Sequence, residues 1–432
     1  MRARFAGPAL LDAACATAFV ALTGGQFLAS FASQLGVTGV FFALLTSLNH
    51  LTTALQPLAA PRVQQADRKS LCIAGSFIAR FSWLAVLATA LTMKPGPASL
   101  AVFLALVLSN TAAAYSANAW LTWVSDLLPA HERPAFFARR NIVVSVTNMA
   151  AVLAGGWYLD WHGGPDGFLH LFAAGIAFGT LSLWALARHP RPALPPAPRL
   201  ATASVTGYVL LPLRDASFRQ ILAFKTAWCF VVGIAAPLWL PHMLDVLRMT
   251  HSQVSAYNLC GLAATVLFSG LFARLASTLG NRPTLLLCAT GIATNPLWWL
   301  LPDRGYLTTC WFEGFWSGAW WSGFNLILLN LAIELAPQAS RPIYLALFQA
   351  AEGLAFLGGA VAGGWLATFT TGFAWHGAGL HLGPYHPVFI LSSVGRFVTI
   401  AVLLLPFAGV TLRPPRALPR PLPPALPARR AA

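Results

Sequence analysis

The segment WFEGFWSGAWW, residues 311–321, contains one acidic side chain within an aromatic and otherwise apolar stretch. On an α-helix, Glu313, Ser317, Trp320 and Phe324 share one face, because their spacing follows the helical repeat. Apolar surroundings disfavour a charged carboxylate, so Glu313 could exchange a proton near neutral pH. It could equally bind a cationic group on which Trp320 stacks. The structural alternative is that Glu313 bonds a neighbouring helix and the tryptophans only pack. We expect a functional role for Glu313 and packing for any single tryptophan.

Polar side chains also occur in other apolar segments. Residues 98–127 carry Thr111, Tyr115, Asn118 and Thr122 on one helical face. A polar stripe on an apolar helix usually faces the protein interior. Solute binding and helix–helix contact both stay open for it, since interhelical amide and hydroxyl bonds are common. The same alternatives apply to three further candidates, which are Gln26, Trp228 and Asn325.

Three charged residues within apolar segments are expected to be structural. Arg80 lies at a depth that matches Asn49 and His50, which are its expected partners. Glu352 and Arg396 lie at similar depth in neighbouring segments, and we expect them to pair. A buried pair can fix helix register without adding much stability. A proton relay is the alternative.

Several classes of function lack their motifs. No GxxxxGK[ST] sequence occurs, which argues against an ATP-driven pump. No nucleophile–base set or zinc signature stands out, so we expect neither an enzyme nor a cofactor. The six cysteines form no CxxC pair and are typical of small buried apolar residues. The spacing of the outer-loop histidines matches no metal-ligand signature, so no metal site is predicted. These histidines are His162, His170, His376, His381 and His386.

The composition requires lipid around most of the chain. Of 432 residues, 57% are apolar and only 9% are charged, whereas a soluble domain has roughly 25% charged residues. A membrane-spanning helix needs roughly 20 apolar residues. Apolar segments near 10–35, 37–60, 70–92, 98–127, 141–159, 168–187, 219–244, 252–273, 284–301, 306–333, 343–370 and 387–408 predict an all-α membrane protein with twelve transmembrane helices.

The distribution of basic residues predicts the topology. Arginine and lysine lie at both termini and in the even-numbered breaks between segments, whereas the odd-numbered breaks hold only Lys94, Arg248 and Arg304. Positive loops stay cytoplasmic, so both termini are expected there. The net charge of +15 therefore reflects topology and attraction to lipid rather than nucleic-acid binding.

The chain contains an internal repeat. DLLPAHERPAFF…AGGW in residues 126–157 matches ELAPQASRPIYL…AGGW in residues 334–365 at a constant offset. Parallel six-helix repeats with a site between them are typical of transporters. We predict a six-helix bundle over residues 1–187, a cytoplasmic linker over 188–218, a second bundle over 219–408 and a basic proline-rich tail over 409–432.

These features resemble the major facilitator superfamily over nearly the whole chain. The basic loop ending Asp67-Arg68-Lys69, its counterpart from Arg274 to Pro283, and the segment from Asp126 to Asn141 resemble loops of that family. The first loop has Ala60-Pro61 near the place of the family's glycine, and the second has Ser277 where an acidic residue is common. The resemblance implies that helices one, four, seven and ten line a central cavity. It also implies gating loops that contain Arg68, Asp126, Arg133, Arg282, Glu334 and Arg341.

The resemblance implies a secondary transporter that works by alternating access in a plasma membrane, with a bacterial inner membrane expected. We expect a small organic substrate and protons as the coupling ion, and the aromatic cavity helices favour efflux of an amphipathic compound. One alternative is uptake of a sugar or organic acid bound by amides. Another is a non-transporting receptor-like or lipid-scrambling protein of the same fold, because fold alone does not determine function.

Overall fold

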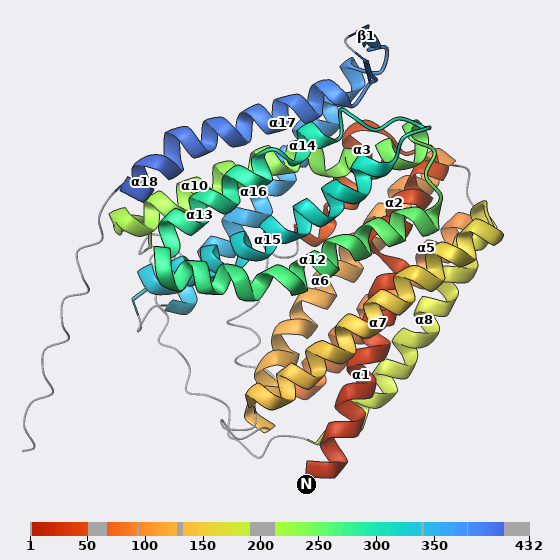
Figure 1. Ribbon diagram of the computed structural model, residues 1–432. Helices are drawn as coiled ribbons and strands as arrows, with labels where there is room; N and C mark the ends of the chain where they lie inside the picture. The colour runs from red at the N-terminus through yellow and green to blue at the C-terminus, as the bar shows by residue number, and fades with distance from the viewer. Residues whose placement is uncertain are drawn as a thin grey trace, which may run out of the picture.

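The computed structural model describes residues 2–50, 67–92, 95–127, 133–190, 212–337, 341–377 and 379–409. Long helices dominate it and form two groups, one from each half of the sequence (Figure 1). The N-terminal half contains α1 (Arg2–Thr23), α2 (Gly25–Gln34), α3 (Gly39–Thr46), α5 (Arg68–Thr92), α6 (Pro95–Leu127), α7 (Arg133–Trp161) and α8 (Pro165–Ala187).

The C-terminal half repeats this arrangement with more interruptions. Its elements are α10 (Ala216–Ala235), a 3-10 turn (Ala236–Leu238), α11 (Trp239–Pro241), a π-helical turn (His242–Val246), α12 (His251–Leu279), α13 (Asn281–Ala293), α14 (Asn295–Trp298), α15 (Thr308–Leu335), α16 (Arg341–Phe369), α17 (His386–Thr399), a second π-helical turn (Ile400–Leu404) and α18 (Leu405–Gly409). Strands β1 (Trp375–Gly377) and β2 (Leu380–Leu382) form an antiparallel hairpin between α16 and α17.

Local sequence explains where several helices begin. The Asp215 carboxylate accepts hydrogen bonds from the first backbone amides of α10, which otherwise have no partner within the helix. Thr250 and Gln253 form a reciprocal capping box at the start of α12. Gly280 ends α12 with a φ of +89°, a conformation that glycine adopts without strain. The adjacent helix α13 can therefore begin directly after it.

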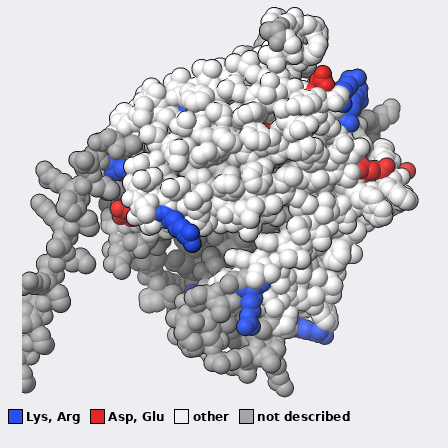
Figure 2. Space-filling view, in the orientation of Figure 1, with Lys and Arg blue, Asp and Glu red and all other residues white. Residues whose placement is uncertain are grey.

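The surface fits a lipid environment. Nine helices among the described residues are long and apolar enough to cross a membrane. The other three predicted segments are also helical where they are described, in α3, in α13 with α14, and in the tryptophan-rich α15. Charged side chains on the visible face lie toward its ends, and most of that face is uncharged (Figure 2). Most residues of the predicted linker, and nearly all of the tail, lie outside the described residues, so their cytoplasmic location stays a prediction.

The repeated AGGW sequences bring the two halves together. A Cβ atom on Gly156 of α7 would collide with His251 of α12, and one on Gly364 of α16 would collide with the Gly39 carbonyl at the start of α3. Helices α7 and α12, and likewise α3 and α16, therefore approach closely across the boundary between the halves. Away from these contacts the two groups of helices diverge, toward the ends that carry the N-terminus and α18 (Figure 1).

Candidate functional site

A cavity of about 430 Å³ lies between the two halves near their close approach. Two interrupted helices shape it. One helix is interrupted at Gly24, between α1 and α2. The other is interrupted near Pro237, between α10 and α11, because proline has no backbone N–H to donate to the helix. Gly25, Gln26, Ala236 and Pro237 at these breaks all line the cavity. Interrupted helices beside a central site are a recurring feature of transporter folds.

The N-terminal half contributes uncharged polar groups to the cavity wall. Gln26 comes from α2, and Ser47, Asn49 and His50 follow α3. The His50 ring stacks on Phe356 of α16, with ring centroids 3.7 Å apart. Sequence reasoning selected only Gln26 for this wall and assigned Asn49 and His50 to Arg80.

Glu313 lies in the wall contributed by the C-terminal half. Its side chain is only 3% exposed, and its Oε2 accepts a hydrogen bond from the Tyr257 hydroxyl of α12 at 2.5 Å. Ser317, one helical turn later, accepts a bond from the Asn295 side-chain amide at 2.8 Å. All four side chains line the cavity. The buried carboxylate therefore belongs to a polar cluster that joins α12, α14 and α15.

Arg396 places a positive charge in the same cavity. This residue of α17 is 2% exposed, and its Nη1 donates to the Ile292 carbonyl at 3.0 Å. The one ion pair that the structure shows within 4.0 Å between described residues joins Lys225 to Glu352, at 2.9 Å. The expected pairing of Glu352 with Arg396 is therefore wrong. Arg396 instead shares the cavity with Glu313 without direct contact.

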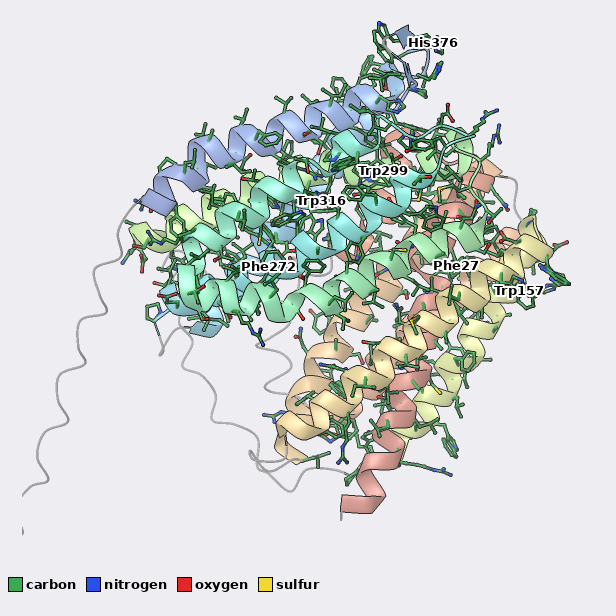
Figure 3. The ribbon with its side chains drawn as sticks, viewed as in Figure 1. Phe27, Trp157, Phe272, Trp299, Trp316 and His376 are labelled. Atoms are coloured by element: carbon green, nitrogen blue, oxygen red, sulfur yellow. The ribbon has the colours of Figure 1, made fainter. Side chains whose placement is uncertain are left out.

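Lys225 is held by contacts with α16. It lies buried in α10, pairs with Glu352 of α16 and stands 5.4 Å from the Phe348 ring centroid. It does not extend toward the membrane surface as a lone lysine near a helix end would. Figure 3 shows the side chains around these helices and labels Trp299, which lines the cavity, and Trp316 in the C-terminal half.

The expected partners of Arg80 are also wrong. Its Nη2 donates to the Ser182 hydroxyl at 2.7 Å, and that hydroxyl donates to Asp12 at 2.5 Å. This chain joins α5, α8 and α1 inside the N-terminal half. It lies away from the cavity, whose wall includes none of the three residues.

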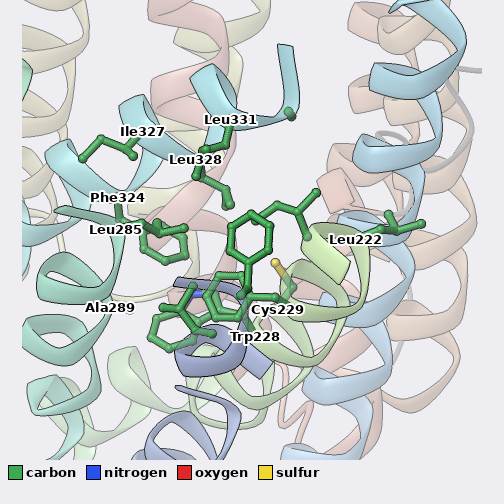
Figure 4. Close-up of a cluster of buried hydrophobic side chains, with 14 of the residues drawn as sticks. Leu222, Trp228, Cys229, Leu285, Ala289, Phe324, Ile327, Leu328 and Leu331 are labelled. Atoms are coloured by element: carbon green, nitrogen blue, oxygen red, sulfur yellow. The ribbon is translucent and has the colours of Figure 1, made fainter. Parts of the chain in front are cut away.

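Several candidate binding residues lie elsewhere. Trp228 and Phe324 are fully buried and stacked at 5.0 Å in the core of the C-terminal half (Figure 4). Trp320 packs beneath Gly291 and against Phe272. None of these residues lines the cavity. Three further candidates also lie outside its wall: Asn325 is exposed, Asn118 is half-buried, and Tyr115 packs beside a core cluster.

The expected gating residues are only partly described. Arg282 donates to the Phe407 carbonyl at 2.7 Å, and Glu334 accepts a bond from Asn281 at 3.2 Å. Arg68 begins α5. The side chains of three further gating residues lie outside the described set, namely Asp126, Arg133 and Arg341. A role in gating stays a prediction for all six.

Hydrogen bonds across the boundary cluster at the closed end. The Asp160 carboxylate of α7 accepts from the backbone amides of His251 and Ser252 at 2.8 and 3.1 Å, where α12 begins. The Gln26 side chain donates to Ser255 and accepts from Asn258, both at 2.7 Å. Nothing in the local sequence indicated these long-range contacts. They close one end of the cavity.

Metal binding finds little support in the described part of the chain, where no group of three histidine, cysteine or acidic side chains could hold an ion. His376 and His381 face each other across the hairpin, with their Nδ1 atoms 2.8 Å apart. Two ligands fall short of the coordination that a structural metal site needs.

Comparisons with known proteins agree with this arrangement. The family model described as Major Facilitator Superfamily matches residues 11–339. A search of curated proteins found no match. Among solved structures, the nucleoside transporter NupG is similar with a TM-score of 0.65 and 12% identity, over 94% of this chain and 100% of that one. A D-xylose–proton symporter gives 0.68 and 12%, over 91% and 96%. A bacterial homologue of the iron transporter ferroportin, in an inward-facing state, gives 0.63 and 13%, over 94% and 98%.

Proposed function

The chain belongs to the major facilitator superfamily, and from this premise we propose that it is a proton-coupled secondary transporter which exports a small amphipathic solute. One observation carries the proposal. A cavity that contains a buried carboxylate lies between two halves whose described residues touch at one of its ends. Rocking of the halves would close the open end and open the closed one.

Glu313 is the proposed coupling group. It is the acidic residue of the cavity wall, and Tyr257 holds one of its oxygens by a hydrogen bond. A carboxylate in a water-poor site can alternate between a neutral and a charged form as its surroundings change. Opening the cavity to the other side would change those surroundings. Proton release and solute movement would thereby be linked.

The open end defines the proposed direction. It lies on the side of the N-terminus and α18 (Figure 1), which the basic loops place in the cytoplasm. A cavity open to the cytoplasm is ready to load a solute for export. The proposed location is a plasma membrane, with both termini inside.

Cysteine labelling tests alternating access directly. Thr46→Cys, at the cavity wall, is introduced after the native cysteines have been replaced, and Val266→Cys, on an exposed apolar surface, is the control. A membrane-impermeant maleimide should modify position 46 from both sides of oriented vesicles, and position 266 from neither. Labelling of position 46 from one side only, with and without a proton gradient, would contradict the transporter proposal.

The coupling role requires a separate experiment. Glu313→Gln should abolish proton-driven accumulation, because the amide cannot release a proton. Asp166→Asn, an exposed change in the first turn of α8, is the matched control and should transport normally. Unchanged proton-driven transport in Glu313→Gln would remove Glu313 from the mechanism.

A further inference from the structure

We infer that the cavity binds a small zwitterion with an apolar body, whose ammonium group contacts Glu313 and whose carboxylate contacts Arg396. This inference rests on the proposed transport function and specifies its substrate class. It begins from two opposite charges, on α15 and α17, that line one cavity and do not pair with each other.

Both charged groups are held by hydrogen bonds to neighbouring residues, and Arg396 has unused hydrogen-bonding capacity. Tyr257 donates to Oε2 of Glu313, and the side chains of Trp299 and Ser317 also hydrogen-bond this carboxylate. Nη1 of Arg396 bonds the Ile292 carbonyl, whereas its buried Nε has no hydrogen-bond partner. The Asn295 side-chain oxygen is likewise buried without a partner. Two groups of one wall, Arg396 and Asn295, therefore lack part of their hydrogen bonding.

Such groups are costly unless a ligand completes them. A buried polar atom without a partner destabilises the protein, and a charged one does so more strongly. An amine would pair with the Glu313 charge but bring a second positive charge near Arg396. A carboxylic acid would do the reverse. A zwitterion supplies an opposite charge to each group and leaves the net charge of the cavity unchanged.

The rest of the wall accommodates an apolar body. Trp239, Trp299, Trp321 and Phe356 line the cavity beside the charged groups. The volume of about 430 Å³ lies at the lower end of the range for small-molecule sites, roughly 300–1,000 Å³. An aromatic amino acid or a molecule of similar size therefore fits the wall chemistry and the available space.

Three ligands of one skeleton test this inference. L-Phenylalanine carries both charges, phenethylamine carries only the ammonium, and 3-phenylpropionate carries only the carboxylate. Their dissociation constants are measured on the full chain in lipid nanodiscs. Wild type should bind L-phenylalanine at least about tenfold more tightly than either analogue, which corresponds to about 1.4 kcal/mol. Equal affinities, or no measurable binding of L-phenylalanine, would overturn the inference.

Substitutions then assign each charge. Glu313→Gln should weaken phenethylamine and spare 3-phenylpropionate, whereas Arg396→Gln should do the reverse. Arg274→Gln, at an exposed position, should change neither. If Arg396→Gln does not fold, Arg396→Lys keeps the charge and should retain the preference for the carboxylate. Equal weakening of all three ligands by both substitutions would indicate a purely structural role and would overturn the inference.

The two proposals fail in different ways. If Thr46→Cys is labelled from both sides but the protein shows no preference for the zwitterion, the proposed substrate class is rejected and the transporter proposal is retained. Loss of two-sided labelling would reject the transporter proposal, whatever the ligand affinities show.

Discussion

The Asp160 carboxylate is expected to stabilise the closed end of the cavity. It belongs to α7 of one half, but it accepts the first two backbone amides of α12 in the other half, at 2.8 and 3.1 Å. Opening this end must break both bonds. Asp160→Ala should therefore shift the protein toward the state in which this end is open.

The size of the shift follows from the type of bond. Removing a side chain that caps a helix N-terminus costs about 1 kcal/mol, which includes its attraction to the helix dipole. At room temperature 1 kcal/mol changes a population ratio about fivefold, since a factor of ten requires about 1.4 kcal/mol. Thr250→Ala is the matched control, because Thr250 caps the same helix from within the same half.

Distances between spin labels measure these populations. Trp161→Cys and Tyr306→Cys place labels on exposed residues of opposite halves near the closed end, in a protein without native cysteines. Asp160→Ala should raise the ratio of the long-distance to the short-distance population about fivefold, whereas Thr250→Ala should lower stability without changing that ratio. Identical distance distributions in wild type and Asp160→Ala, or equal shifts in both variants, would refute this reasoning.

Three further predictions follow from the packing and the charge pairs. Gly364→Ala should open the same end in the label assay, because its new Cβ would lie 2.7 Å from the Gly39 carbonyl, whereas Gly358→Ala, with 3.6 Å to Phe230, should not. Lys225→Ala should lower the free energy of unfolding by roughly 1–3 kcal/mol. This loss is smaller than for a fully buried pair, because the Glu352 side chain is 28% exposed. Adding Glu352→Gln should restore part of the lost stability, as measured by thermal unfolding. Trp228→Ala should lower unfolding stability by roughly 3–5 kcal/mol and leave ligand affinity unchanged, and lost affinity at full stability would place Trp228 in the binding site.

The fold was predictable because membranes restrict it strongly. Apolar length defined the helical segments, and the AGGW repeat at residues 154–157 and 362–365 indicated two related halves. The repeat also contained close contacts between the halves, at Gly156 and Gly364. A small residue indicates close approach without identifying the partner helix.

The site was predictable only in part, for a geometric reason. Glu313 could be selected because a carboxylate within an apolar helix is rare and costly. Depth in the membrane could not identify its neighbours, so Arg396 was paired with Glu352 although Lys225 holds that residue. Helical periodicity placed Phe324 on the face of Glu313. About three turns farther along the helix, however, that face lies in the packed core.

Gln26 connects the cavity with its closed end. Its side chain lines the cavity, and the same amide donates to Ser255 and accepts from Asn258 of the other half. A solute that takes over either bond would weaken the contact that keeps this end closed. A ligand shifts a conformational equilibrium only through a difference in its affinity for the two states. The two charges belong to the C-terminal half, so they can hold the solute in both states, whereas Gln26 bonds across the boundary in only one. It is therefore the residue through which occupancy of the cavity can favour opening.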